Sequence, residues 1–128
     1  MPNPEYPQFV SALEERYGDD LRWIASFDSE SFAYNVRYVR EDLKTDLSDR
    51  DLQIIIHRSM AVFNRRHVED VYSHLGDAQS LVVQHEEATA VHLYLDDRTG
   101  VVVKLAAGAR VELPTFREEY LDLLYGRR

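Results

Sequence analysis

The sequence predicts a single α+β domain, residues 1–128, with a five-stranded antiparallel sheet covered by helices. Three observations lead to this prediction. Apolar residues recur at helical spacing near both ends of the chain, five short segments alternate apolar and polar residues, and one long helical segment separates the second of these from the third. The expected order is therefore helix, strand, strand, long helix, strand, strand, strand and helix. A chain of this length buries roughly two thirds of its unfolded surface, which is enough for one core.

The first helix and the first two strands follow from local patterns. Apolar residues recur at helical spacing from Tyr6 to Tyr17, and Gly18 follows as a left-handed helix stop. Two alternating segments, 21–27 and 32–38, are joined by turn residues and predict a hairpin. The alternation gives each strand one common apolar face: Leu21, Trp23, Ala25 and Phe27 in the first strand, and Phe32, Tyr34, Val36 and Tyr38 in the second.

The central segment predicts one long helix. Ser48, with Asp51 three residues later, forms an acidic variant of the capping box, and neither glycine nor proline occurs before Gly76. Two apolar stripes on this helix are rotated relative to each other, which predicts a kink or break near Asn64 to Arg66. The first stripe comprises Leu52, Ile55, Ile56, Ser59 and Phe63, and the second comprises Val68, Val71 and Leu75.

Three more strands and a last helix complete the pattern. The segments 81–84, 91–95 and 101–104 alternate apolar and polar residues. Between the last two, residues 96–100 predict a turn in which Gly100 supplies a positive φ. Thr115 and Glu118 form a capping box that opens the final helix. Its apolar face carries Phe116, Tyr120, Leu123 and Leu124.

The charge composition is acidic, and its cations are almost all arginines. The chain has 23 aspartates and glutamates against 15 lysines and arginines, for a net charge of −8, and only Lys44 and Lys104 are lysines. Such a surface resembles those of proteins from organisms with a salt-filled cytoplasm, so we expect a halophilic archaeal host. The chain has no cysteine, no signal-peptide pattern and no apolar stretch near the roughly 20 residues that span a bilayer, so we expect a cytoplasmic protein.

Five histidines raise the question of a metal site. If the turn before the fourth strand is centred on Glu87 and Ala88, His92 lies opposite Val83. His85 and His92 are then diagonal neighbours on the same face of the sheet, close enough for their side chains to meet. However, no histidine spacing in the chain matches a zinc pattern. We therefore expect His85 and His92 to be polar residues on the more solvent-exposed face of the sheet.

No catalytic motif accompanies the fold pattern. His67, His74 and Asp70 share a face of the long helix, but a helix this rich in charge offers such pairs by chance. The chain also lacks a phosphate loop, a dinucleotide fingerprint and a nucleophile elbow. We therefore predict a protein that is not an enzyme and that needs neither a cofactor nor a metal.

One basic cluster lies in the long helix. Arg58, Arg65 and Arg66, together with His67, could bind phosphate or carboxylate groups in bidentate fashion. The cluster supports an alternative function as a DNA-associated transcriptional regulator. Acidic residues follow at once, however, and the net charge opposes nucleic-acid binding, which makes an isolated basic spot on a solvated helix the commoner explanation.

The order of elements, from Phe9 to Leu124, resembles that of the dynein light chain roadblock family within the longin and profilin-like group. Supporting details are the long helix ending at Leu75 and Gly76 directly before a strand, the tight hairpins and the closing amphipathic helix. The resemblance implies a small non-catalytic platform that forms homodimers through the long helix and a sheet edge, often beside a Ras-like GTPase.

This resemblance leads to a functional hypothesis: a homodimeric regulatory or scaffolding module. A five-stranded sheet has exposed edges that need cover, and the long helix carries more apolar positions than one sheet face requires. A second alternative is a small-ligand sensor with its pocket between the sheet and the terminal helices. The candidate partner or dimer interface comprises Ile55, Ser59, Met60, Val62, Phe63, Arg65, Arg66, Leu81 and Val83.

Overall fold

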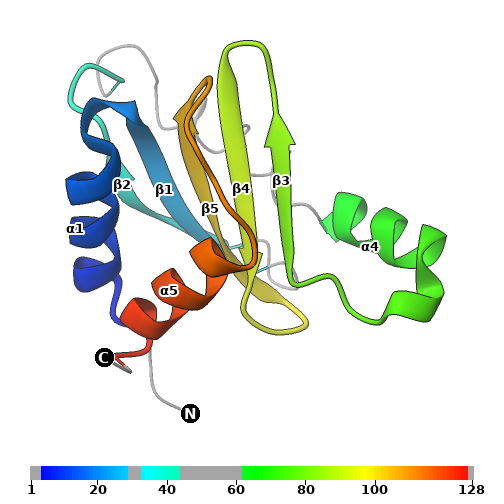
Figure 1. The fold of residues 1–128 in the computed structure, drawn as a ribbon. Helices are drawn as coiled ribbons and strands as arrows, with labels where there is room; N and C mark the ends of the chain where they lie inside the picture. The colour runs from blue at the N-terminus through cyan, green and yellow to red at the C-terminus, as the bar shows by residue number, and fades with distance from the viewer. Residues whose placement is uncertain (1–3, 29–32, 44–61, 127–128) are drawn as a thin grey trace.

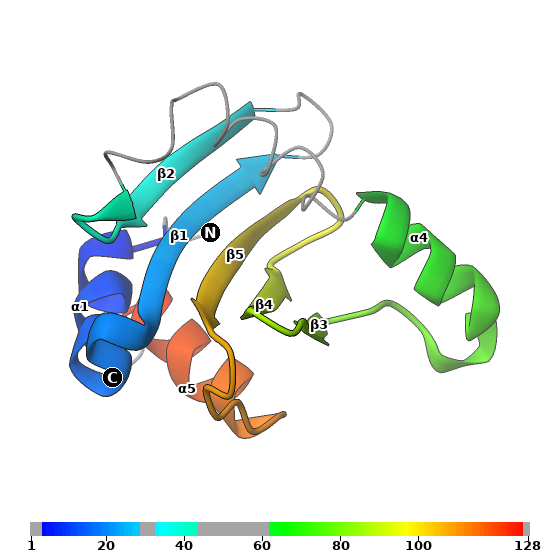
Figure 2. The ribbon, with the colours of Figure 1, turned by 90° about the horizontal axis from the view of Figure 1, so that it is seen from above.

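The computed structural model describes residues 4–28, 33–43 and 62–126. Five antiparallel strands form one sheet in the order β2-β1-β5-β4-β3, with α1 and α5 packed on one face (Figures 1 and 2). This architecture confirms the predicted α+β class. The elements are α1 (Tyr6–Tyr17), η1 (Gly18–Asp20), β1 (Leu21–Asp28), β2 (Ala33–Val39), α4 (Val62–Val71), η2 (Ser73–Leu75), β3 (Ser80–Gln84), β4 (Ala88–Tyr94), β5 (Thr99–Ala106) and α5 (Thr115–Leu124).

The main core lies between the sheet and the two terminal helices. α1 contributes Phe9 and Leu13, and α5 contributes Phe116, Tyr120 and Leu124, all fully buried. The Tyr120 ring contacts Phe9 edge-on at 6.1 Å and Phe116 at 4.6 Å between ring centroids. The predicted apolar faces of both helices are thus confirmed. The hypothesis of a small-ligand sensor places a pocket between the sheet and the terminal helices. In the structure this layer is filled by core side chains.

Two β-bulges change the faces predicted for the first hairpin. In β1, Leu21 pairs with Leu105 and Trp23 with Lys104, so Arg22 is an extra residue and Leu21 joins the helix-side core, away from Trp23. The prediction of one common face is therefore wrong at this end of the strand. A bulge inserts one residue and reverses the alternation beyond it.

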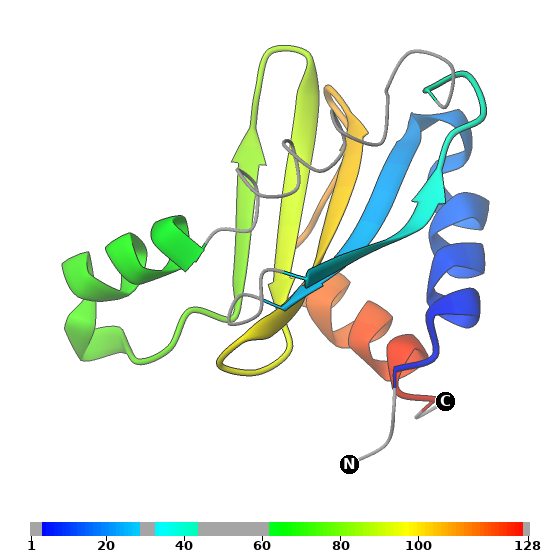
Figure 3. The same cartoon turned by 180° about the vertical axis from the view of Figure 1, so that it is seen from behind.

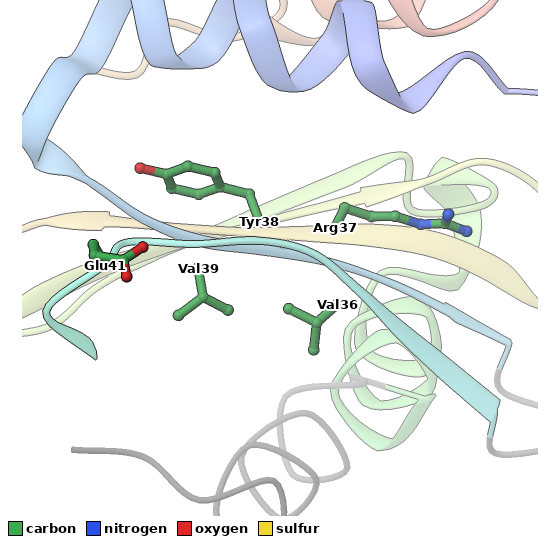
Figure 4. A pocket seen from close by; sticks show the side chains of 5 residues that line it. All are labelled: Val36, Arg37, Tyr38, Val39 and Glu41. Carbon is green, nitrogen blue, oxygen red and sulfur yellow. The ribbon is translucent and has the colours of Figure 1, made fainter. Parts of the chain in front are cut away.

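The second bulge lies in β2. Ile24 pairs with Tyr38 and Ala25 with Val36, which leaves Arg37 as the extra residue. Tyr38 and Arg37 both point toward α1, whereas Val36 and Val39 point to the opposite side (Figure 4). The predicted common face of Val36 and Tyr38 is therefore also wrong.

The β3–β4 hairpin has a register two residues away from the predicted one. Leu81 pairs with His92 and Val83 with Ala90, whereas the prediction placed His92 opposite Val83. His92 is buried at 3% exposure, and His85 is exposed and aligned with Ala88 at the hairpin end. The two histidines are consequently not diagonal neighbours.

The described part of the long helix differs from the prediction at its end. α4 passes through Asn64 to Arg66 without a break and stops at Val71, because Tyr72 leaves the helical conformation at φ −112° and ψ 45°. A short 3₁₀ turn and Gly76, with φ of 85°, follow before β3. The predicted helix end at Leu75 is therefore four residues late. The predicted helix start at Ser48 lies outside the described residues. None of the described helices is both long enough and apolar enough to cross a bilayer.

Two turn and capping predictions are also corrected. Gly100 lies inside β5 without a positive φ, and the preceding turn is held by Asp96, whose Oδ1 accepts hydrogen bonds from the amides of Arg98 and Thr99. In α5 the N-cap residue is Pro114, so Thr115 is already helical and makes no side-chain cap. The capping box is absent because the helix begins one residue earlier than the motif requires.

Candidate functional site

α4 lies beside the edge strand β3, away from α1 and α5 (Figures 1 and 2). Arg65 connects this helix to the sheet: its Nη1 donates to the Asp96 carbonyl oxygen at 2.8 Å, and its guanidinium lies 4.6 Å from the centre of the Tyr94 ring. Glu69, one turn later, pairs with Arg65 at 3.4 Å and accepts the Ala78 amide at 2.7 Å. These two side chains therefore hold α4 against the β4–β5 turn and the segment before β3.

The Arg65 guanidinium packs on the ring of Tyr94. Burial raises the pKa of Tyr94 to about 12, although the Arg65 charge opposes this shift. The hydroxyl is therefore neutral throughout the ordinary pH range. Tyr94 also packs edge-on against Phe27, with the ring centroids 6.4 Å apart, and Leu81 of β3 packs on the same cluster.

An exposed apolar patch lies at the end of α4. We define this α4-end patch as Val71, Tyr72 and Leu75, which are 57%, 52% and 67% exposed. Large apolar side chains that gather on a surface and are uncovered mark interaction sites. The second predicted apolar stripe, which contains Val71 and Leu75, is therefore not covered by the rest of the described chain.

β3 forms one edge of the sheet, and no described strand pairs with its outer side. Leu81 and Val83 are half-buried and point away from α1 and α5, since they pair with His92 and Ala90. Arg117 of α5 secures the inner side by donating to the carbonyl oxygens of Gln79 and Tyr94. An unpaired edge strand is a ready template for another strand.

The predicted interface residues do not all lie together. Arg65 contacts Tyr94 and Leu81 packs on the same cluster, whereas Val83 lies farther along β3, opposite Ala90, and Arg66 is exposed on α4. Val62 and Phe63 are described only as part of the α4 backbone. Ile55, Ser59 and Met60 lie outside the described residues, as does Arg58. The sequence did not single out Tyr72, whose exposure of 52% depends on where α4 ends.

Arg65, a half-buried member of the arginine cluster, binds groups of this protein, whereas DNA binding requires guanidinium groups that are free to contact phosphate. The Arg65 side chain is only 13% exposed, and its donors face Glu69 and Asp96. A phosphate would have to break these contacts to reach the guanidinium. Among the described residues, no group of three histidine, aspartate or glutamate side chains is arranged to hold a metal ion.

Replacing Arg65 with alanine is expected to lower the free energy of unfolding by about 1–2 kcal/mol, because the ring contact, the Asp96 hydrogen bond and the Glu69 pair are lost together. Arg66→Ala, on the exposed side of the same helix, is the matched control and should change stability by less than about 0.5 kcal/mol. Urea denaturation of the two variants tests this. Equal stabilities would contradict the anchoring role.

A hollow of about 440 Å³ lies along β2. Its lining comes from both faces of the strand, since Arg37 and Tyr38 point one way and Val36 and Val39 the other (Figure 4). The Arg37 guanidinium lies 4.0 Å from the centre of the Tyr6 ring and donates to Ser26 Oγ at 3.0 Å. This hollow is thus the outer edge of the sheet rather than an enclosed cavity.

Comparisons with known proteins agree with this architecture. A family model described as a domain of unknown function (DUF7522) matches residues 7–125. A Roadblock/LC7 domain from Streptomyces avermitilis superposes with a TM-score of 0.60 at 14% identity, covering 91% of this chain and 88% of that one. MglB from Myxococcus xanthus gives 0.57 at 12% identity, covering 99% and 92%.

An MglB structure with a tetrameric arrangement gives a TM-score of 0.56 at 16% identity, covering 98% of this chain and 93% of the other. A comparison with curated protein sequences gives no significant match. At these low identities the structural similarity shows the fold, which is roadblock-like over nearly the whole chain, as the order of elements predicts.

Proposed function

The chain belongs to the DUF7522 family, a domain of unknown function, and we propose that it is a non-catalytic regulatory or scaffolding module that acts as a homodimer. The observation that carries the proposal is the exposed α4-end patch, and it is supported by the edge of β3, with which no described strand pairs. The roadblock-like fold supports it, and one similar protein, MglB, has been solved in a tetrameric arrangement.

The physical argument rests on two complementary features. An edge strand offers a row of backbone donors and acceptors, which an antiparallel copy of the same strand can satisfy around a twofold axis. The exposed apolar side chains of the α4-end patch would add burial, and each contributes twice in a symmetric dimer. The proposed interface comprises the α4-end patch, Leu81 and Val83, together with the positions predicted from the sequence, Ile55, Ser59, Met60, Val62, Phe63 and Arg66.

The test is the mass in solution. The wild type is expected to elute at twice the 14.9 kDa chain mass in light scattering after gel filtration. Leu75→Glu should weaken dimerisation roughly 100-fold or more, because a buried leucine contributes about 1.5–3 kcal/mol per copy and a charge would be buried instead. This variant and the wild type should be measured in low and molar salt, since the chain carries a charge of −8.

The matched control is Leu113→Glu, which changes another exposed leucine, 44% exposed and next to α5. This variant should remain a dimer. A wild type that is monomeric at all concentrations would overturn the homodimer, and equal masses for the two variants would remove the α4-end patch from the interface.

A small Ras-like GTPase is the partner that the roadblock resemblance implies for such a module. Affinity capture of the tagged chain from its host's lysate at native salt, followed by mass spectrometry, tests this partner. Stoichiometric recovery of a GTPase by the wild type supports the proposal. Recovery of only the chain itself would contradict it.

A further inference from the structure

A cavity of about 320 Å³ lies on the sheet face away from α1 and α5, where β1 begins and the β3–β4 hairpin turns. Figure 3 views the sheet from this side. Trp23 and Val102 are buried and supply apolar wall, and cationic side chains lie next to them. The lining comprises Arg22, Trp23, His85, Glu87, Ala88, Ala90, Val102 and Lys104.

The β1 bulge brings two cations together here. Arg22 is the extra residue of the bulge, and its neighbour Trp23 pairs across to Lys104 of β5. The Lys104 ammonium lies 5.8 Å from the centre of the Trp23 ring. Burial lowers the pKa of Lys104, and the nearby Arg22 charge lowers it further. Both residues therefore belong to one small, partly desolvated positive site.

Neither cation is neutralised within the described residues. Arg22 Nε is buried and has no hydrogen-bond partner there, and neither Arg22 nor Lys104 forms an ion pair with a described carboxylate. A buried donor without a partner and two adjacent like charges both cost stability, and a bound anion removes both costs.

We propose that this cavity binds a small organic anion, with its carboxylate or phosphate group between Arg22 and Lys104 and its flat apolar body against Trp23. The volume is at the lower end for ligand pockets, so it suits a metabolite-sized molecule. His85 can add a donor, whereas the Glu87 carboxylate repels a second negative charge, which favours ligands with one anionic end. The site is independent of the proposed dimer.

Trp23 is the only tryptophan in the chain, so its fluorescence reports directly on the cavity. Titration with sodium benzoate and, separately, with sodium phosphate at constant ionic strength should give a saturable change for at least one probe. Benzoate alone would indicate carboxylates with a flat body, phosphate alone would indicate phosphorylated ligands, and both would indicate a general anion site. No saturable change with either probe would overturn the proposal.

Charge-removing variants locate the binding. Lys104→Met and Arg22→Gln should each weaken binding at least 10-fold, because each removes one of the two charges. Arg110→Gln is the matched control, since that side chain is 83% exposed and outside the cavity. Equal affinities for all three variants would place the anion elsewhere and refute the site.

Thermal unfolding without ligand separates lost binding from lost folding. Lys104→Met is expected to unfold no lower than the wild type, because the substitution removes a partly buried charge that forms no ion pair with any described carboxylate. A saturating concentration of the probe that binds, benzoate or phosphate, should raise the melting temperature of the wild type and not that of Lys104→Met. A stabilisation by that probe that is the same in both proteins would again contradict the proposal.

Discussion

Gly100→Ala is expected to lower the free energy of unfolding by about 2–3 kcal/mol, the upper range for forcing an extra methyl group into a packed site. An added Cβ would overlap Phe27 Cζ and lie 2.8 Å from the Leu93 carbonyl oxygen. Neither neighbour can move easily, since Phe27 is 5% exposed and packs on Tyr94, and the carbonyl belongs to the adjacent strand β4. Urea denaturation monitored by circular dichroism measures the loss.

Gly108→Ala separates steric overlap from backbone strain. Gly108 has a φ of 81°, but a Cβ there would meet nothing within 4 Å. This variant should therefore lose only about 1 kcal/mol, the usual cost of a left-handed alanine. If Gly108→Ala were the less stable of the two variants, close approach at Gly100 would not be the reason for its glycine.

Gly100 also illustrates what the sequence could and could not predict. A glycine after Asp96 and Asp97 is typical of a turn, so local pattern favoured a positive φ at a position that instead lies in β5, against Phe27. Elements set by local periodicity, such as α1 with its stop at Gly18, were predicted correctly. The bulges at Arg22 and Arg37 were missed, because a bulge is defined by pairing with a strand elsewhere in the chain.

The same distinction applies to the candidate sites. The predicted hairpin register was wrong by two residues, an even number, so His92 still faces the side predicted for it while its partner is Leu81. Arg65 was identified as a notable cation from its neighbours in the sequence. Its actual contacts, the Asp96 carbonyl oxygen and the Tyr94 ring, come from another hairpin and carry no local signal. The anion cavity was missed for this reason as well.

Phe116→Ala is expected to have the largest effect on stability, a loss of about 3–5 kcal/mol, because it removes a fully buried ring and leaves a cavity. Phe116 is 1% exposed and joins α5 to the core through Tyr120 and, at 6.4 Å between ring centroids, Tyr17 of α1. Leu113→Ala is the control, since this nearby leucine is exposed and should lose less than about 1 kcal/mol.

The outcome also decides between two roles for the layer of terminal helices. A ligand pocket between the sheet and α5 would tolerate a smaller side chain at position 116, since space already exists there to be enlarged. A packed core would not, because its surroundings relax only partly around the cavity. If Phe116→Ala loses much of its free energy of unfolding and Leu113→Ala does not, the layer of α1 and α5 is a packed core. Any binding site then lies on the opposite face of the sheet or at the β3 edge. A loss below about 1 kcal/mol would restore the sensor pocket beneath the terminal helices.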